Sequence, residues 1–287
     1  MIKFITTFSQ NGYNLYGKNW IEKFIENTNS PDITADIYVD FPITTNCDRI
    51  NILDFDTEVP EWKIWSSKFK LRSRHQDYAK TGCLKFSFIA FVMAKALKKA
   101  TKGYVIWLDG DAMITNNDFD GFPQNIMNGN FAAVQREYTG STVHCESGIV
   151  VFDAENKEKE LFADNLLNEY LDFMNLMSVA EPFDGYMIWR ALIKSNISNT
   201  DLNDGFGRGG IQSDPNHTFL NPEINKRFKH NIGVTGKQQY ANWESIWRTD
   251  DFFKLAVEVV RSIRPRTQQE IKRVEDKKSK FLSRRTK

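Results

Sequence analysis

The sequence predicts an α/β fold in which a mostly parallel central sheet is flanked by helices. Short apolar runs alternate with amphipathic helical stretches between residue 2 and about residue 174, the order that parallel sheets covered by helices produce. The run at 104–108 contains only Tyr, Val, Ile, Trp and Leu, which predicts a central strand buried on both faces. Hydrophobic residues make up 41% of the 287 positions, enough for one large core.

The first expected elements are a strand, a helix and a second strand. Residues 2–8 are largely apolar and lead into a polar turn, so we expect a strand there. The large apolar side chains within 20–25 recur at helical spacing. Residues 36–40 predict a short second strand. Polar residues then dominate through 41–65, where the sequence predicts an irregular region.

The middle of the chain continues the alternation. A helix is expected over 82–100, because its apolar residues share one face and three lysines crowd its last turn, where they oppose the helix dipole. It leads directly into the strand at 104–108. Two further strands are expected at 130–135 and 147–152, and a helix over 161–174.

Charge divides the chain into two predicted parts. Residues 261–287 contain 11 Lys or Arg and 3 Asp or Glu, a net charge of +8, whereas residues 1–260 carry −7. We therefore expect one domain over 1–260 and a basic C-terminal tail over 261–287. The tail has few apolar residues, so it is either a solvated helix, a disordered end or a peripheral contact with an anionic membrane.

Composition also limits the cellular setting and the partners. Three cysteines without a CxxC pair indicate neither a disulfide framework nor a thiolate zinc site, which fits a reducing compartment. No signal peptide and no long apolar run are evident, so the expectation is a cytoplasmic protein, peripheral to the membrane if the tail binds one. A nucleic acid partner is not expected, and the sequence does not predict the oligomeric state.

Two carboxylates follow the buried strand at 104–108. Asp109 and Asp111 are separated by Gly110, and the carboxyl end of a strand is where open α/β sheets bind ligands. Carboxylates placed so close repel each other unless they share a cation, and their oxygens suit Mn²⁺ or Mg²⁺. An ordinary turn is the alternative, because Asp-Gly is a common turn pair.

The strand with its Asp109-Gly-Asp111 ending resembles the Asp-x-Asp signature of the GT-A glycosyltransferases, which use nucleotide sugars. The resemblance covers about residues 1–245 and is nearest to the retaining families eight and thirty-four. A late element from His230 to Lys237 is similar to the His-x-x-Gly-x-x-Lys element of family eight, although Lys237 here follows His230 by seven positions and not six.

This resemblance implies a set of cofactors and binding residues. The implied cofactors are Mn²⁺ or Mg²⁺ and a nucleotide-sugar donor, with UDP as the leading nucleotide. The resemblance implies metal ligation by Asp109, Asp111 and His230. Nucleotide contacts are implied at Thr6, Thr7 and Phe8 for the base and ribose, and at Arg74, Lys85, Asp109 and Lys237 for the diphosphate.

Two further acids are candidates for the reacting sugar. Asp184 precedes an apolar helix and resembles in placement the acid that many retaining enzymes use near the anomeric carbon, and Glu146 precedes a strand. The alternatives are a helix-capping role for Asp184 and an ion pair for Glu146. With these residues, the implied reaction is transfer of a hexose, with retention, from the donor to a hydroxyl of a glycan or another acceptor.

Three other functions remain open. A sugar nucleotidyltransferase would share the architecture, but it normally carries a basic Gly-rich loop after the first strand. A haloacid-dehalogenase-like phosphatase also ends a strand in Asp-x-Asp, but normally on its first strand. A non-catalytic carbohydrate-binding protein is the third alternative, and intact Asp109 and Asp111 speak against it.

Overall fold

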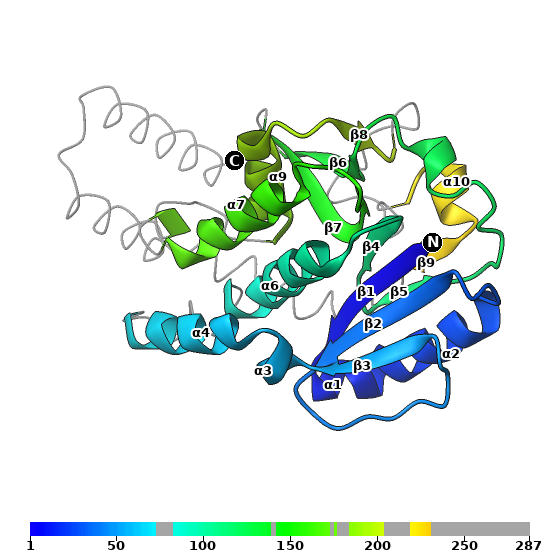
Figure 1. Cartoon of the computed structure of the whole chain (residues 1–287), viewed down its shortest axis with the longest axis horizontal. Coiled ribbons are helices and arrows are strands. Elements are labelled where there is room, and N and C mark those ends of the chain that lie inside the picture. Colours follow the sequence, from blue (N-terminus) through cyan, green and yellow to red (C-terminus); the bar gives the residue numbers. More distant parts are fainter. Residues whose placement is uncertain (73–82, 139–141, 173–174, 177–183, 204–218, 231–287) are drawn as a thin grey trace, which may run out of the picture.

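The computed structural model of the chain describes residues 1–72, 83–138, 142–172, 175–176, 184–203 and 219–230 (Figure 1). Several sequence-based expectations fall outside these residues, namely Arg74, Lys237 and the tail at 261–287. The boundary of the domain at residue 260 therefore stays a prediction. Within the described residues, no helix has both the length and the apolar character needed to cross a membrane.

The centre of the fold is a seven-stranded mixed sheet in which parallel pairs predominate. Its strand order is β3-β2-β1-β4-β7-β6-β8. The first four of these are parallel, β7 runs antiparallel to both its neighbours, and β8 is parallel to β6. The bounds are β1 Ile2–Phe8, β2 Ile33–Val39, β3 Ile50–Asp54, β4 Tyr104–Leu108, β6 Phe131–Tyr138, β7 Thr142–Asp153 and β8 Asn199–Asp201.

A second, two-stranded sheet lies beside the central one. It pairs β5 (Ala112–Ile114), which follows β4 closely, with β9 (Phe228–His230), the last described strand. The pairing is antiparallel, with Ala112 opposite His230. Two strands of three residues form a marginal sheet on their own, so this pair depends on its packing against the rest of the domain.

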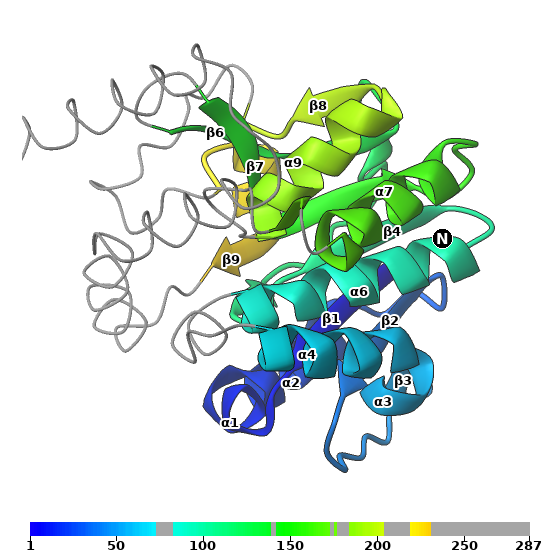
Figure 2. The ribbon, with the colours of Figure 1, turned by 90° about the vertical axis from the view of Figure 1, so that its left-hand side faces the viewer.

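Helices cover both faces of the central sheet. The helical segments are α1 Gln10–Gly12, the π-helix η1 Tyr13–Gly17, α2 Lys18–Asn27, α3 Phe55–Glu58, α4 Pro60–Arg72, α6 Leu84–Lys99, the 3₁₀ turn η3 Gln124–Ile126, α7 Lys159–Leu171, α9 Asp184–Ser195 and α10 Pro222–Asn225. Figure 2 shows α4, α6 and α7 lying side by side over one face. The other face is covered by α2 and by the β5–β9 pair.

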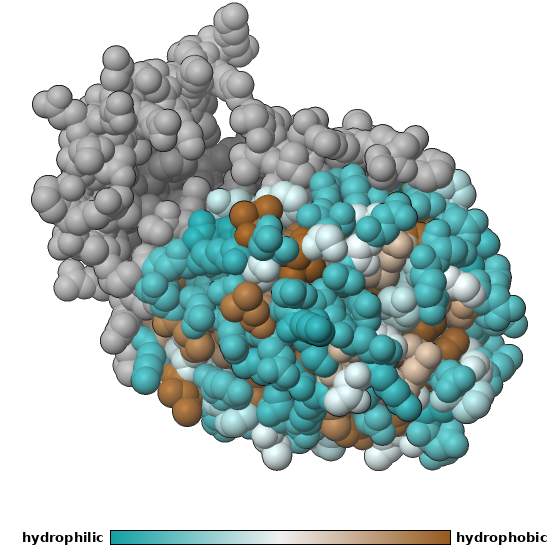
Figure 3. All heavy atoms as spheres, turned by 45° about the horizontal axis from the view of Figure 1, so that its top comes forward, coloured by the Kyte–Doolittle hydropathy of each residue, from teal (hydrophilic) through white to brown (hydrophobic). Residues whose placement is uncertain are grey.

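Side chains of β1 alternate between the two cores. Phe4 and Phe8 pack with Trp20 and Phe24 of α2 on one face, whereas Ile5 packs on the face covered by α6. On the view in Figure 3, hydrophobic side chains form small separate groups among hydrophilic ones. Scattered apolar side chains of this kind are ordinary on a protein surface.

The predicted fold class is confirmed, and so are the strands expected at 2–8 and 104–108 and the helix that the structure places at Leu84–Lys99. The expectation of an irregular region over 41–65 is wrong for its second half, where β3, α3 and the start of α4 lie. β3 is an edge strand in which only the first residue is buried. Because an edge strand need not be apolar on both faces, its sequence lacks the apolar run that marks a central strand.

A buried hydrogen bond connects two of the helices on the α6 face. Trp65 of α4 is 5% exposed, and its Nε1 donates to the carbonyl oxygen of Tyr170 in α7 at 2.7 Å. We expect Trp65→Phe to lower the free energy of unfolding by about 2 kcal/mol, because it removes this donor and leaves a small void.

Trp62→Phe is the matched control, and chemical denaturation measures the free energy of unfolding of both variants. Trp62 is half-buried and donates to the Ser87 hydroxyl at 2.8 Å, which itself donates to Leu84. Its loss is expected to stay below about 1 kcal/mol, since the Ser87 hydroxyl keeps its hydrogen bond to the Leu84 carbonyl. A larger loss for Trp62→Phe than for Trp65→Phe would contradict this account of the α4–α7 contact.

Candidate active site

The Asp109-Gly-Asp111 segment forms a tight turn between β4 and β5. The backbone N–H of Ala112 donates to the carbonyl of Asp109 at 2.9 Å, which closes the turn. The N–H of Asp109 donates to the Gly148 carbonyl of β7 at 3.0 Å, which ties the turn to the central sheet. Both acids therefore lie at the carboxyl end of β4, as the sequence predicts, and both are half-buried.

The β5–β9 pair brings His230 to this turn. Because Ala112 lies opposite His230, the imidazole comes next to Asp111, with Nε2 of His230 3.1 Å from Oδ1 of Asp111. Ligand atoms of Asp109, Asp111 and His230 all lie within 4.8 Å of one another. Residues that are more than a hundred positions apart in the sequence thus converge at one point.

Negative charges lie close together at this turn, and their mutual repulsion acts mainly on Asp109. Burial raises the pKa of Asp109 well above its usual range, and the charges of Asp111 and Asp184 raise it further. His230 and a hydrogen bond from Trp107 Nε1, 2.7 Å long, oppose this shift of the pKa only in part. The ionised form of Asp109 is therefore costly in the protein alone.

His230 responds to the same charges in the opposite direction. Burial by itself disfavours its charged form, but the hydrogen bond with Asp111 and the charges of Asp111, Asp109 and Glu146 outweigh that effect and raise its pKa. The charges of three carboxylates thus favour the protonated imidazole, and Asp111 contacts it directly. Two carboxylates and an imidazole at these distances fit a divalent cation such as Mn²⁺, which accepts oxygen and nitrogen ligands.

An irregularity in β7 places Glu146 near this cluster. Ala133 of β6 pairs with Val150, but the next residue, Val134, pairs with Glu146, so residues 147–149 of β7 have no partner in β6. Bulges of this kind redirect side chains and are common beside active sites. Glu146 is half-buried, and its charge acts on His230.

Asp184 reaches the cluster from the first turn of α9. Its side chain is 5% exposed, and Oδ1 accepts from the N–H of Gly185 at 2.9 Å. A Cβ at Gly185 would lie 2.2 Å from the carbonyl oxygen of Cys145, so only glycine lets α9 begin directly against β7. Asp184 is therefore the first residue of its helix, and its charge also acts on Asp109. The capping alternative stays a prediction.

The residues expected to contact a nucleotide base lie mostly inside the domain. Thr6 is fully buried, and Phe8 is 2% exposed and packs against Tyr13, Tyr16 and Trp20. Thr7 is half-buried and donates to the Tyr38 carbonyl at 2.7 Å. In this structure the phenyl ring of Phe8 is thus a core group beneath the rings of η1.

Of the residues expected to contact the diphosphate, Asp109 lies in the cluster, but no described contact brings the basic ones to it. Lys85 lies near the start of α6, which covers the face opposite α2. Arg74 and Lys237 lie outside the described residues. Their roles therefore remain predictions.

Tyr16 is a site residue that sequence reasoning missed. It is half-buried in η1, and its pKa is raised by burial and by the charges of Asp111 and Asp109. A Cβ at Gly110 would lie 2.8 Å from Cε2 of Tyr16 and 2.7 Å from Cε1 of Phe8. The sequence signal that could have revealed this packing is Gly110, because a glycine between the two acids leaves room for aromatic rings.

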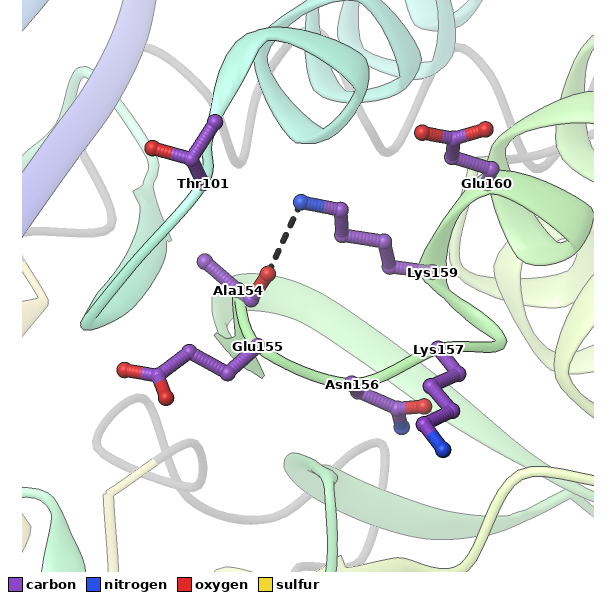
Figure 4. A pocket seen from close by; sticks show the side chains of 7 residues that line it. All are labelled: Thr101, Ala154, Glu155, Asn156, Lys157, Lys159 and Glu160. Carbon is purple, nitrogen blue, oxygen red and sulfur yellow. Dashed lines mark hydrogen bonds between the residues drawn. The ribbon is translucent and has the colours of Figure 1, made fainter.

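A separate hollow lies at the other end of β4. It has a volume of about 540 Å³ and is lined by Thr101, Ala154, Glu155, Asn156, Lys157, Lys159 and Glu160 (Figure 4). Lys159 donates to the Ala154 carbonyl at 2.8 Å and also to that of Ala100, so its ammonium group forms hydrogen bonds that stabilise the fold. Since β4 is five residues long, this hollow is about 17 Å from the acids.

Comparisons with known proteins give matches among solved structures only. No protein-family profile matches the chain, and no curated protein matches its sequence. Among solved structures, the galactosyltransferase LgtC in complex with donor and acceptor sugar analogues is 14% identical, with 93% of this chain and 98% of that chain covered and a TM-score of 0.45.

Two further matches are apo structures. Glycosyltransferase GlyE of Streptococcus pneumoniae TIGR4 is 14% identical, with 93% of this chain and 65% of that chain covered and a TM-score of 0.43. The WbbM bifunctional glycosyltransferase is 13% identical over 69% of this chain, with a TM-score of 0.39. This chain spans 38% of the length of WbbM.

The packing of Gly110 generates a prediction about the turn. In Gly110→Ala, the new methyl group meets the Phe8 and Tyr16 rings, and Phe8 has no space to retreat. We expect a loss of about 1–3 kcal/mol in the free energy of unfolding. Adding Phe8→Leu to Gly110→Ala should cost less than the sum of the two single changes, a coupling that a double-mutant cycle measures. Strict additivity would show that the rings do not constrain the turn.

The repulsion at Asp109 generates a second prediction. In the presence of EDTA, Asp109→Asn should stabilise the fold by about 1 kcal/mol, or roughly 2–4 °C in Tm, because it removes a costly carboxylate. The raised pKa means that ionisation of Asp109 costs stability as the pH rises above the ordinary value of 3.8. The gain should therefore be larger at about pH 8 than at about pH 5.

Asp56→Asn is the control for this measurement. Asp56 is 47% exposed and pairs with Lys63 at the surface, so its replacement should change Tm little at either pH. A fall in Tm for Asp109→Asn in EDTA at neutral pH would show that the carboxylate of Asp109 stabilises the metal-free fold.

Proposed function

We propose that the protein is a metal-dependent glycosyltransferase of GT-A type, which moves a hexose from a nucleotide-diphosphate sugar to an acceptor hydroxyl with retention. The observation that carries this proposal is the convergence of Asp109, Asp111 and His230 at the carboxyl end of β4. In open α/β sheets, this end of the strands is where ligands bind.

The chemistry of the reaction accounts for these residues. Breaking a bond between a sugar and a diphosphate builds negative charge on the departing oxygens, and a bound divalent cation neutralises such charge. Asp109, Asp111 and His230 would hold the cation. The repulsion at Asp109 and the position of His230 support this role, because a positive ion would relieve the cost that burial and Asp111 impose.

Glu146 and Asp184 are proposed to act on the sugar. Both carry charges that are felt at the metal-ligand cluster, and they come from two elements packed directly on each other. A carboxylate beside the anomeric carbon can stabilise the positive charge that develops there. Asp184 is the first candidate for this position, with Glu146 oriented toward the acceptor or the sugar hydroxyls. Retention rests on the resemblance of the His230 element alone.

The base of the nucleotide is proposed to lie on the aromatic surface after β1. Tyr13 and Phe41 are both half-buried, with ring centroids 5.6 Å apart. Tyr13 and Tyr16 both pack on Phe8, and the charges of the two acids act on Tyr16. Aromatic faces of this kind stack on bases. Thr6, Thr7 and Phe8 would then support the rings from below. Lys85, Arg74 and Lys237 remain the candidates for the diphosphate.

The setting and the acceptor are also proposals. We propose a cytoplasmic enzyme that acts on a glycan or another hydroxyl-bearing acceptor, with UDP as the leading donor nucleotide. The basic residues of 261–287 would suit contact with an anionic membrane surface.

The donor can be chosen by a thermal-shift screen of UDP-, GDP-, CMP- and dTDP-sugars with and without Mn²⁺, since ligands that bind only the folded state raise Tm. With that donor, Asp109→Asn and Asp111→Asn should each lower Mn²⁺-dependent sugar release by at least about 100-fold while the chain stays folded. Asp56→Asn should keep the wild-type rate, because Asp56 lies in a surface ion pair.

The products separate this function from its rivals. A glycosyltransferase transfers the sugar of its donor to the acceptor hydroxyl, or to water when no acceptor is present, and releases the nucleoside diphosphate. When a nucleoside triphosphate and a sugar phosphate are supplied as substrates, release of pyrophosphate would indicate a nucleotidyltransferase. Release of inorganic phosphate from a sugar phosphate would indicate a phosphatase. Full activity in both Asp→Asn variants would rule out the proposed metal site.

A further inference from the structure

The short β5–β9 pair has to hold two of the proposed metal ligands in register. Asp111 immediately precedes β5, and His230 ends β9. Each strand has three residues, so the ladder contributes few hydrogen bonds of its own. The distance between Asp111 and His230 therefore depends on whatever fixes the chain after β5 and the chain before β9.

One buried side chain connects those two segments. Arg227, the residue before β9, is 1% exposed. Its Nε donates to the carbonyl of Asp118 in the segment that follows β5, and its Nη2 lies 3.5 Å from Oδ2 of the same residue. Its Nη1 donates to the carbonyl and to Oε2 of Glu223 in α10, at 2.8 and 2.9 Å.

The backbone at Arg227 reinforces the same connection. The N–H of Thr115, just beyond β5, donates to the Arg227 carbonyl at 2.8 Å. The guanidinium carbon also lies 5.0 Å from the centroid of Phe122, a core ring that packs on Phe228 of β9. Arg227 thus holds the chain on both sides of the strand pair through its side chain and its backbone.

The chemistry of this residue is specific to arginine. A buried cation loses its hydration, and this loss is compensated only when donors and acceptors meet in good geometry. The planar guanidinium offers five donors in a rigid fork, whereas a lysine ammonium acts as a point charge on a flexible stem. The hydrogen bond from Arg227 also lowers the pKa of Glu223, so this carboxylate stays ionised as its partner.

We propose that Arg227 is a positioning residue for the metal site, and that its guanidinium sets the place of His230 relative to Asp109 and Asp111. This inference rests on the proposed function, because it assumes that the three residues bind a divalent cation. Arg227 would not contact the cation, the donor or the acceptor. Its effect would pass through the β5–β9 pair.

The test measures metal binding in the intact chain. Mn²⁺ affinity is determined by electron paramagnetic resonance titration, and the ligand geometry is followed by the visible spectrum of bound Co²⁺. We expect Arg227→Met to weaken Mn²⁺ binding by about tenfold, in the range found when residues that orient metal ligands are removed. The Co²⁺ spectrum should change as well. Arg227→Lys keeps the charge without the fork and should give an intermediate effect.

Trp65→Phe is the control for stability alone. It removes a buried hydrogen bond between α4 and α7, on the opposite face from the β5–β9 pair. It should retain the Mn²⁺ affinity and Co²⁺ spectrum of the wild type despite its lower stability. If Arg227→Met does not fold, Arg227→Lys decides the question.

Each outcome has a separate meaning. Wild-type affinity and an unchanged Co²⁺ spectrum in the folded Arg227 variants would overturn the positioning role and leave the proposed function intact. Loss of affinity in Trp65→Phe equal to that in Arg227→Met would also overturn it, because the effect would then follow stability. Absence of Mn²⁺ binding in the wild type would contradict the proposed function itself.

Discussion

The crowding of negative charge after β4 is the constraint on which the site depends. Asp109 is placed where burial, Asp111 and Asp184 all oppose its ionised form, whereas His230 and the Trp107 hydrogen bond act in the other direction. A fold selected for stability alone has no need of such a cluster, since an apolar side chain at the end of β4 would avoid the cost. Strain of this electrostatic kind is typical of sites that bind a ligand of opposite charge.

The scaffold maintains this cluster by small departures from regular structure. Gly110 gives room to two aromatic rings, Gly185 allows α9 to begin against β7, and the irregular pairing of β6 with β7 changes which side chains face the turn. β1 and β4 pair regularly with each other, and most of their side chains are buried. Rigid strands therefore supply the reference frame, and the glycines and the bulge direct the acids within it.

Sequence patterns reveal the parts of this arrangement that local physics determines. Residues 104–108 read as a buried strand because every side chain is apolar, and Asp109 and Asp111 then lie at its end by chain connectivity alone. Local patterns do not identify His230. Its three-residue strand has no recognisable period, and only a resemblance to a known element singled it out, while its contact with Asp111 comes from tertiary pairing.

The features that the sequence did not predict have a common physical cause, namely that they depend on tertiary packing. Burial of Phe8 depends on how η1 folds back over β1, which no pattern within residues 2–8 encodes. The edge strand β3 is only partly buried, so it lacks the apolar run that marks β4. Asp184 looks like an ordinary helix-capping residue in the sequence, and its second role as a charge beside Asp109 exists only because α9 packs on β7.

The central claim is that Asp109, Asp111 and His230 together bind a divalent cation that meets a diphosphate. A crystal structure of the protein grown with MnCl₂ and UDP, with anomalous diffraction recorded at the manganese edge, tests it most directly. The account predicts one strong anomalous peak within bonding distance of both carboxylates and of the His230 imidazole, with diphosphate oxygens completing the coordination. A peak elsewhere, or UDP bound with no metal at this turn, would contradict it.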